Sequence, residues 1–341
     1  VLRGSASTRY GSDAMGGALL ATPIDPSMQL GARSWQARPR GMFRSGTADG
    51  ELGGRAQLDL AYKDKLGFFG GVGYRDVSLL RTGGPIYSPT TGRPVKVPLF
   101  AADGVTQRGT GFKELTADAR LVWQASDRVR LTLAYYDYRQ FDAPRTDRCP
   151  PATAPQSECL TYDEQHRTLV YTALDLHDGP AFAETLRFTV NYQNQHERRR
   201  FDRGAESTYR IIGRDDVHTA GTGLALRTKE WGPRGKLRFS VSYGLDAYLD
   251  TIRSKAWNVY TDVNITSALS RGQYLDGGRY LTSGLWTTGH LKLHERLELR
   301  AGVRGALVSA SAPGGPATRS AAIDRRSGAA VGSGGAALTL R

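Results

Sequence analysis

The stretch LTADARLVWQASDRVRLTLAYY, residues 115–136, is the part of the chain that decides the fold class. Apolar side chains recur at every second position on each side of a polar turn at Ala125-Ser126-Asp127. The first run has Leu115, Ala117, Ala119, Leu121 and Trp123 alternating with Thr116, Asp118 and Arg120, and the second has Val129, Leu131, Leu133 and Tyr135 alternating with Arg130, Thr132, Ala134 and Tyr136. Period-two alternation places successive side chains on opposite faces of a sheet. The stretch therefore predicts an antiparallel β-hairpin with one apolar and one polar face.

The same pattern recurs along the chain from about Arg55 onward. Further hairpins are expected around the turns at 63–65, 178–180, 232–235 and 294–296. Longer segments rich in glycine, proline and charge separate them, for example about 80–109. Short turns that alternate with long loops are typical of a transmembrane barrel with short periplasmic turns and long outer loops, whereas a β-sandwich has loops of similar length at both ends.

Aromatic residues near the strand ends support the membrane interpretation. Aromatic girdles lie at the two interfaces of an outer-membrane barrel. Side chains that fit such girdles are Tyr62, Trp123, Tyr135, Tyr192 and Tyr243. We therefore predict an all-β fold, an antiparallel up-and-down transmembrane β-barrel that is partial, with about twelve strands. Leu121, Leu131, Leu133, Phe188, Val190, Phe239 and Val241 are expected to face lipid, and Arg120, Arg130, Arg187 and Arg238 the lumen.

Composition excludes several other classes of protein. The 341 residues include 41 glycines, and the mean hydropathy is −0.43. No window approaches the roughly 18 uninterrupted apolar residues of a membrane helix. The formal charge is +13, but basic residues are spread along the chain. The densest run, Arg198-Arg199-Arg200, is expected in a loop beside Glu197 and Asp202. Nucleic acid is therefore not expected as a partner.

Cys149 and Cys159 are the two cysteines, with nine residues between them in a loop rich in proline and alanine. This spacing favours a local disulfide in an oxidising compartment. The alternatives are two free thiols or half of a metal site, although no other cysteine or histidine lies beside them at zinc-ligand spacing.

The first 22 residues carry a motif that names a family. Its residues are Arg3, Gly4, Tyr10, Gly11, Ser12, Gly16 and Gly17, in the pattern Leu-Arg-Gly, Tyr-Gly-Ser and a spaced Gly-Gly. This segment resembles the end of the plug domain in TonB-dependent outer-membrane receptors, with Ser5 where the family usually has proline and Leu20 where it often has asparagine. The resemblance implies that residues 1–24 end a plug domain and that 25–341 form the N-terminal half of a 22-stranded barrel. Both ends then belong to a longer chain.

The resemblance also implies a function for the whole protein. It would lie in the outer membrane of a Gram-negative bacterium, surrounded by lipid, and import a scarce nutrient complex, a ferric siderophore being the commonest ligand. Energy would come from the TonB–ExbB–ExbD complex through a TonB box upstream. The alternative is a passive porin or adhesin barrel, which would have no plug. The plug segment is expected inside the curve of the sheet, because its glycines suit close contact and make a poor strand.

No enzyme is expected, because the chain lacks the nucleophile, metalloprotease and phosphate-loop motifs, and no cofactor or metal site is assigned. His290 and His294 would lie about 13 Å apart on a strand, too far apart to chelate one ion. An inner face with Arg55, Arg120, Arg130, Arg187, Arg238 and Arg300 would favour anionic ligands. Equally, these arginines could pair with carboxylates of the lumen or of the plug.

Overall fold

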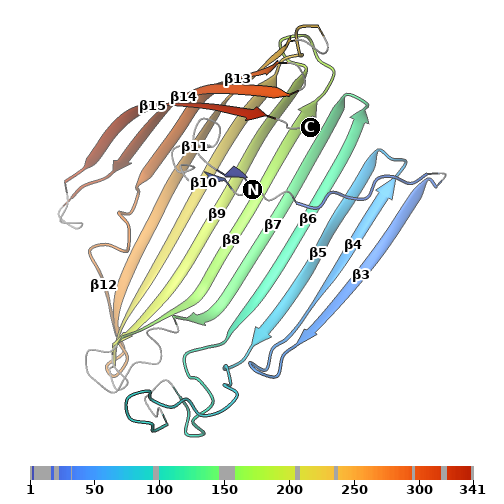
Figure 1. The fold of residues 1–341 in the computed structure, drawn as a ribbon. Helices are drawn as coiled ribbons and strands as arrows, with labels where there is room; N and C mark the ends of the chain where they lie inside the picture. The colour runs from blue at the N-terminus through green and yellow to red at the C-terminus, as the bar shows by residue number, and fades with distance from the viewer. Residues whose placement is uncertain are drawn as a thin grey trace.

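The chain forms one large curved sheet (Figure 1). The computed structural model describes residues 2–3, 17–18, 23–31, 33–94, 100–145, 158–203, 208–233, 237–293, 296–315 and 321–338. Its long strands are β3 (Trp35–Ser45), β4 (Leu52–Tyr62), β5 (Leu66–Val77), β6 (Phe112–Ser126), β7 (Val129–Pro144), β8 (Glu158–Leu176), β9 (Thr185–Arg203), β10 (Tyr209–Arg227), β11 (Leu237–Tyr260), β13 (Arg279–Leu293), β14 (Leu297–Ala312) and β15 (Ile323–Leu338). Within these ranges there is no helix that is long and apolar enough to cross a membrane.

Each long strand pairs antiparallel with its neighbours in the chain. The sheet has 13 strands in the order β15-β14-β13-β11-β10-β9-β8-β7-β6-β5-β4-β3, with the short β12 (Ile265–Ala268) paired to the end of β11. Among the described residues β3 and β15 do not pair with each other, so the sheet is open. This confirms an all-β, up-and-down, partial barrel.

The two ends of the sheet differ in their connections. At one end the strands are joined by short connections. At the predicted turn 63–65, Lys63 and Asp64 both have positive φ, 50° and 51°, as a tight hairpin turn that follows the sheet's twist requires; the predicted turns at 232–235 and 294–296 include residues outside the described ranges. At the other end residues 78–111 form the longest connection, but β9 and β10 are joined by 204–208 alone. We call these the short-turn end and the loop end. Loops are thus shorter at the loop end than the sequence indicates, because the strands extend farther.

The run Arg198–Arg200 corrects one expectation, since it lies within β9 rather than in a loop. Arg199 bonds Asp215 of β10 at 2.7 Å, and Arg200 bonds Asp163 at 3.1 Å. Strands here continue past the apolar stretch with charged side chains on both faces. The strand therefore extends beyond the residues that alternate between apolar and polar, and alternation does not predict where it ends.

The exposure of side chains is the reverse of that in a soluble sheet. Leu121, Leu133 and Phe188 are 40%, 47% and 41% exposed, whereas Arg120 is 7% exposed. Val190 and Phe239 are also exposed, and Leu131 and Val241 are half-buried. Apolar side chains on the outside and buried polar ones on the inside are the pattern of a lipid-facing strand surface. Five of the seven apolar side chains are thus exposed, as expected for the outer face, and that lipid covers this face stays a prediction.

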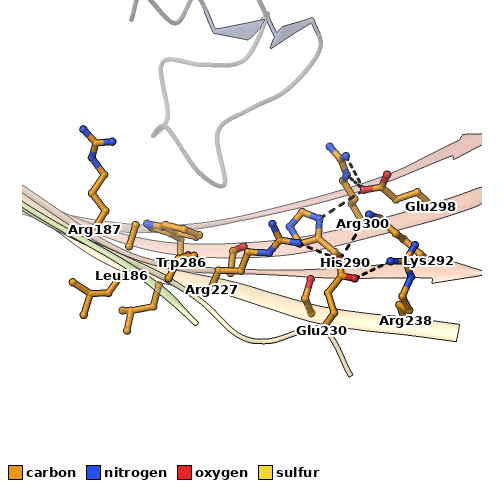
Figure 2. A pocket seen from close by; sticks show the side chains of 15 residues that line it. Leu186, Arg187, Arg227, Glu230, Arg238, Trp286, His290, Lys292, Glu298 and Arg300 are labelled. Atoms are coloured by element: carbon orange, nitrogen blue, oxygen red, sulfur yellow. Dashed lines mark hydrogen bonds and ion pairs between the residues drawn. The ribbon is translucent and has the colours of Figure 1, made fainter. Parts of the chain in front are cut away.

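The N-terminal residues do not extend this sheet. β1 (Leu2–Arg3) and β2 (Gly17–Ala18) form a separate two-stranded sheet, with Arg3 opposite Gly17. Figure 2 draws these two short strands on the side of the large sheet toward which Arg187 and Arg300 point. The other residues of the glycine motif, Gly4, Tyr10, Gly11, Ser12 and Gly16, lie outside the described residues.

Candidate functional site on the inner face

The segment 23–31 crosses the face of the sheet that carries Arg120, which we call the inner face. Its Asp25 bridges two strands: one carboxylate oxygen accepts from Arg120 Nε of β6 and the other from Arg130 Nη2 of β7, each at 2.6 Å. Arg120 also donates to the Tyr171 hydroxyl of β8 and lies 5.9 Å from that ring's centroid. Charge-assisted hydrogen bonds of this kind are short and strong. The segment is therefore held on the inner face by a carboxylate between two guanidinium groups.

Two backbone groups hold the segment as well. The Ser27 amide donates to Asp59 Oδ1 at 3.1 Å, and the Leu30 amide donates to Asp64 Oδ1 at 2.8 Å. Both acceptors belong to β4 and the turn that follows it. Leu30 itself is buried, at 7% exposure. A segment without secondary structure thus has its backbone donors satisfied by the wall.

Gly67 leaves room for this contact. A Cβ at this position of β5 would come within 2.6 Å of Pro26 Cβ and 2.8 Å of Met28 Cγ. Real Cβ atoms do not approach so closely, so a larger residue would displace the segment. Glycine is required here for the close approach of another chain segment rather than for an unusual φ.

The charge of Asp25 suits this anchoring role. Partial burial would raise its pKa, but the hydrogen bonds from Arg130 and Arg120 outweigh that effect and lower the pKa below its usual value. The carboxylate is consequently ionised throughout the neutral range.

Salt bridges cover the inner face, and they decide the open question about its arginines. All six arginines considered in the sequence have carboxylate partners: Arg55 with Asp118, Arg120 and Arg130 with Asp25, Arg187 with Asp175, Arg238 with Glu230 and Arg300 with Glu298. Arg304 of β14, 7% exposed as a side chain, forms a bidentate pair with Asp246 of β11 at 2.8 and 2.7 Å. Each of these arginines therefore has a carboxylate partner, so its presence alone does not indicate an anionic ligand, although Asp25 and Glu230 each serve more than one cation.

Near the short-turn end the inner face forms a cavity of about 420 Å³ (Figure 2). Glu230 faces three cations there, at 3.3 Å from Arg227, 3.1 Å from Arg238 and 3.8 Å from Lys292. Across it Glu298 pairs with Arg300 at 2.7 Å. His290 lies 3.9 Å from Glu298, while His294 lies outside the described residues. Five basic side chains and two glutamates line this cavity, so it keeps a net positive charge although its cations lie close to carboxylates.

A second inner-face cavity, of about 460 Å³, lies toward the loop end. Hydroxyl, amide and charged groups line it, including Tyr138, Gln140, Arg167, Glu197 and Tyr274. Tyr138 donates to Glu114 at 3.1 Å. Such a surface can exchange hydrogen bonds with a polar ligand that enters from the loop end. Among the residues described here, we find no nucleophile paired with a base of the kind that acyl or phosphoryl transfer needs.

The cysteines remain a prediction. Cys159 lies in β8, opposite Asp202 of β9, rather than in a loop; it is 8% exposed, with its sulfur 3.7 Å from the Thr161 hydroxyl. Cys149 lies outside the described residues.

Comparison with solved structures identifies the fold. The copper transporter OprC matches with a TM-score of 0.72 and 13% identity over 99% of this chain and 47% of its own. The FrpB iron transporter of Neisseria meningitidis matches with 0.66 and 12% over 99% and 49%, and the siderophore receptor PiuA of Acinetobacter baumannii with 0.62 and 11% over 99% and 51%. The chain thus spans about half the length of the structures it matches. No protein-family model and no curated protein matches the sequence.

Proposed function

With the barrel fold of outer-membrane metal and siderophore receptors as the premise, we propose that this chain is the end of the plug and the first half of the barrel of a TonB-dependent receptor. The receptor lies in the outer membrane of a Gram-negative bacterium and imports a scarce nutrient complex, with a ferric siderophore as the proposed ligand. One observation carries the proposal: a chain segment reaches β3 across the inner face, bound there by Asp25. A passive porin or adhesin barrel has no plug to which such a segment would lead.

The polar inner face supports the mechanism. A ligand captured at the loop end would meet the hydrogen-bonding cavity around Tyr138 and Arg167. Passage then requires that the plug rearrange, and the TonB–ExbB–ExbD complex would supply the force through a TonB box upstream. Paired charges on the wall can exchange partners with a moving plug at little net cost, because each group keeps a counter-charge.

Uptake by the intact protein tests the proposal. A strain that lacks its own receptors is complemented with the full-length gene and given a panel of ⁵⁵Fe-labelled siderophores, with haem and copper as further ligands. We expect accumulation of one ligand class that stops when a protonophore or a deletion of tonB removes the energy source. Uptake that continues unchanged under both conditions would favour the passive barrel.

Removal of the plug is a second test of the proposed function. A variant without the plug, residues 1–22 included, but with the barrel retained should lose energy-dependent uptake and should admit vancomycin, which is too large for ordinary porins. A full-length variant with Arg187→Lys serves as the control, because it keeps the inner-face charge and the plug. If energy-dependent uptake survived plug removal, the mechanism would be wrong.

A further inference from the structure

Glu164, His166 and His196 form a cluster on the outward face of β8 and β9, and the proposed transport function does not use it. On β9 the outward-facing apolar side chains run from Leu186 to Tyr192, and on β8 they end at Val170, which pairs with Tyr192. His166 and His196 lie four residues beyond these, toward the loop end, and occupy the same face because side chains alternate with period two. Four residues of strand correspond to about 13 Å. These histidines therefore lie outside the apolar band, on the outer surface.

The two histidines are direct neighbours across the strand pair. His166 is opposite His196 in the register, and their ring centroids lie 5.2 Å apart. Glu164 of β8 is the third member, with Oε2 3.2 Å from His196 Nε2. One ligand atom from each of the three residues lies within 4.8 Å of the others. A tetrahedral zinc ion with bonds of about 2.0–2.1 Å needs ligand atoms about 3.3 Å apart, so side-chain rotations of roughly 1 Å complete the geometry.

The outer partners of the cluster already orient one ligand. His196 Nδ1 lies 2.7 Å from Asp216 Oδ1 of β10. A proton on Nδ1 that is donated to this carboxylate leaves the Nε2 lone pair directed at Glu164 and His166. The carboxylate–histidine arrangement is the one that fixes tautomer and ring orientation in metal sites.

His166 supplies an independent observation. Its Nε2 is buried and has no hydrogen-bond partner. A buried nitrogen of this kind costs roughly 1–3 kcal/mol if it stays unsatisfied. A purely structural hydrogen-bond network accounts for His196, which has two carboxylate partners, but leaves His166 unexplained. A cation bound between the rings accounts for both.

We propose that Glu164, His166 and His196 bind a divalent first-row transition-metal ion such as Zn²⁺, oriented by Asp216. Two imidazoles and one carboxylate favour such an ion over Mg²⁺ or Ca²⁺, which prefer oxygen ligands. The fourth coordination position faces an outward pocket of about 540 Å³ beside Trp257 and Arg214, where water or an external ligand completes the shell. Arg198, 3.6 Å from Glu164 Oε1, holds the other carboxylate oxygen. The site lies outside the lumen and does not depend on transport.

Metal titration of the full-length protein in detergent tests the site. The protein carries no histidine tag, and Zn²⁺ alone is added in a calorimeter. The variants His166→Gln and His196→Gln should each bind one zinc ion fewer per chain than the native protein. Asp216→Asn should keep the stoichiometry but weaken affinity by about 10- to 100-fold. His218→Gln is the matched control. This histidine lies on the outward face of β10 and is hydrogen-bonded to Tyr192 and Asn194, outside the cluster. Its substitution should change neither the number of zinc ions bound nor the affinity.

Zinc X-ray absorption on the unmodified protein gives a second readout that needs no variant. Two imidazole nitrogens and one carboxylate oxygen at about 2.0–2.2 Å are expected. Equal stoichiometry in the native protein and both His→Gln variants would overturn the proposal, as would a zinc shell without imidazole.

Discussion

The substitution Asp25→Asn tests whether the segment 23–31 is held on the inner face by charge. The side chain keeps its shape but loses the negative charge between Arg120 and Arg130. Arg120 is 9% exposed as a side chain, so its bond to Asp25 is sheltered, whereas Arg130 is 30% and Asp25 45% exposed. A sheltered hydrogen bond to a charged group contributes about 1.5–3 kcal/mol, and an exposed ion pair only about 0–1 kcal/mol.

The exposed half of the bridge contributes little, and asparagine can still accept a weaker hydrogen bond. We therefore expect the free energy that holds the segment on the inner face to fall by about 1.4 to 2.8 kcal/mol, which raises its opening equilibrium by a factor of about 10 to 100. The substitution should make local opening of the segment easier, with little effect on global unfolding. Hydrogen exchange of full-length protein, followed by mass spectrometry, reads the opening directly. Protection of the amides of Ser27 and Leu30, which bond Asp59 and Asp64, should decrease by that factor.

Asp175→Asn is the matched control, since Asp175 pairs with Arg187 on the same inner face and makes no described contact with the segment. Unchanged protection of 23–31 in Asp25→Asn, or an equal decrease in the control, would refute the anchoring role. The pH dependence has a definite sign. Because the pKa of Asp25 is lowered in the folded state, its contribution is present above the unfolded value near 3.8 and is lost as pH falls through the folded pKa.

Three further predictions concern the wall and its loops. Asp246→Ala removes the counter-charge of Arg304, its buried bidentate partner. The free energy of unfolding should fall by about 3 kcal/mol in denaturant titrations. A decrease under about 0.5 kcal/mol would show that solvent satisfies the arginine. Cys149 and Cys159 are predicted to be linked, so proteolysis without reductant should yield one cross-linked peptide pair by mass spectrometry, and two separately recovered thiol peptides would contradict this. Phe188→Arg puts a charge on an outward-facing side chain that is 41% exposed and should cost about 2–4 kcal/mol in lipid if the site is near mid-bilayer; a neutral effect on folding into vesicles would mean that lipid does not cover this surface.

Alternation alone identified the fold class and the two faces. Leu121 and Arg120 are neighbours in the sequence and differ only in the side of the strand they occupy, and the structure gives them 40% and 7% exposure as expected. The turns at 63–65 and after Ser126 were also predictable, because they interrupt strong alternation with polar residues. The reason is physical: a strand at a lipid boundary must place apolar groups on one face, so its pattern is local.

Strands were not predictable where lipid does not constrain them. The loop-end part of β9, with Arg198–Arg200, has polar residues on both faces. Beyond the apolar band both faces can meet water, and hydrogen bonding to a neighbouring strand suffices to continue the ladder. β3 keeps the alternation, with Trp35, Ala37, Pro39 and Phe43 against Gln36, Arg38, Arg40 and Arg44, but its central proline suits only an edge strand and weakens the strand signal.

Pairings between distant residues were decided only by the tertiary structure. Arg120 meets Asp25, 95 residues away, Arg304 meets Asp246, 58 away, and His166 and His196 become neighbours through strand register. The composition could not distinguish an arginine that awaits an anionic ligand from one already neutralised. That distinction depends on which carboxylate the curvature and register of the sheet bring within hydrogen-bonding distance, and no local pattern in the sequence encodes it.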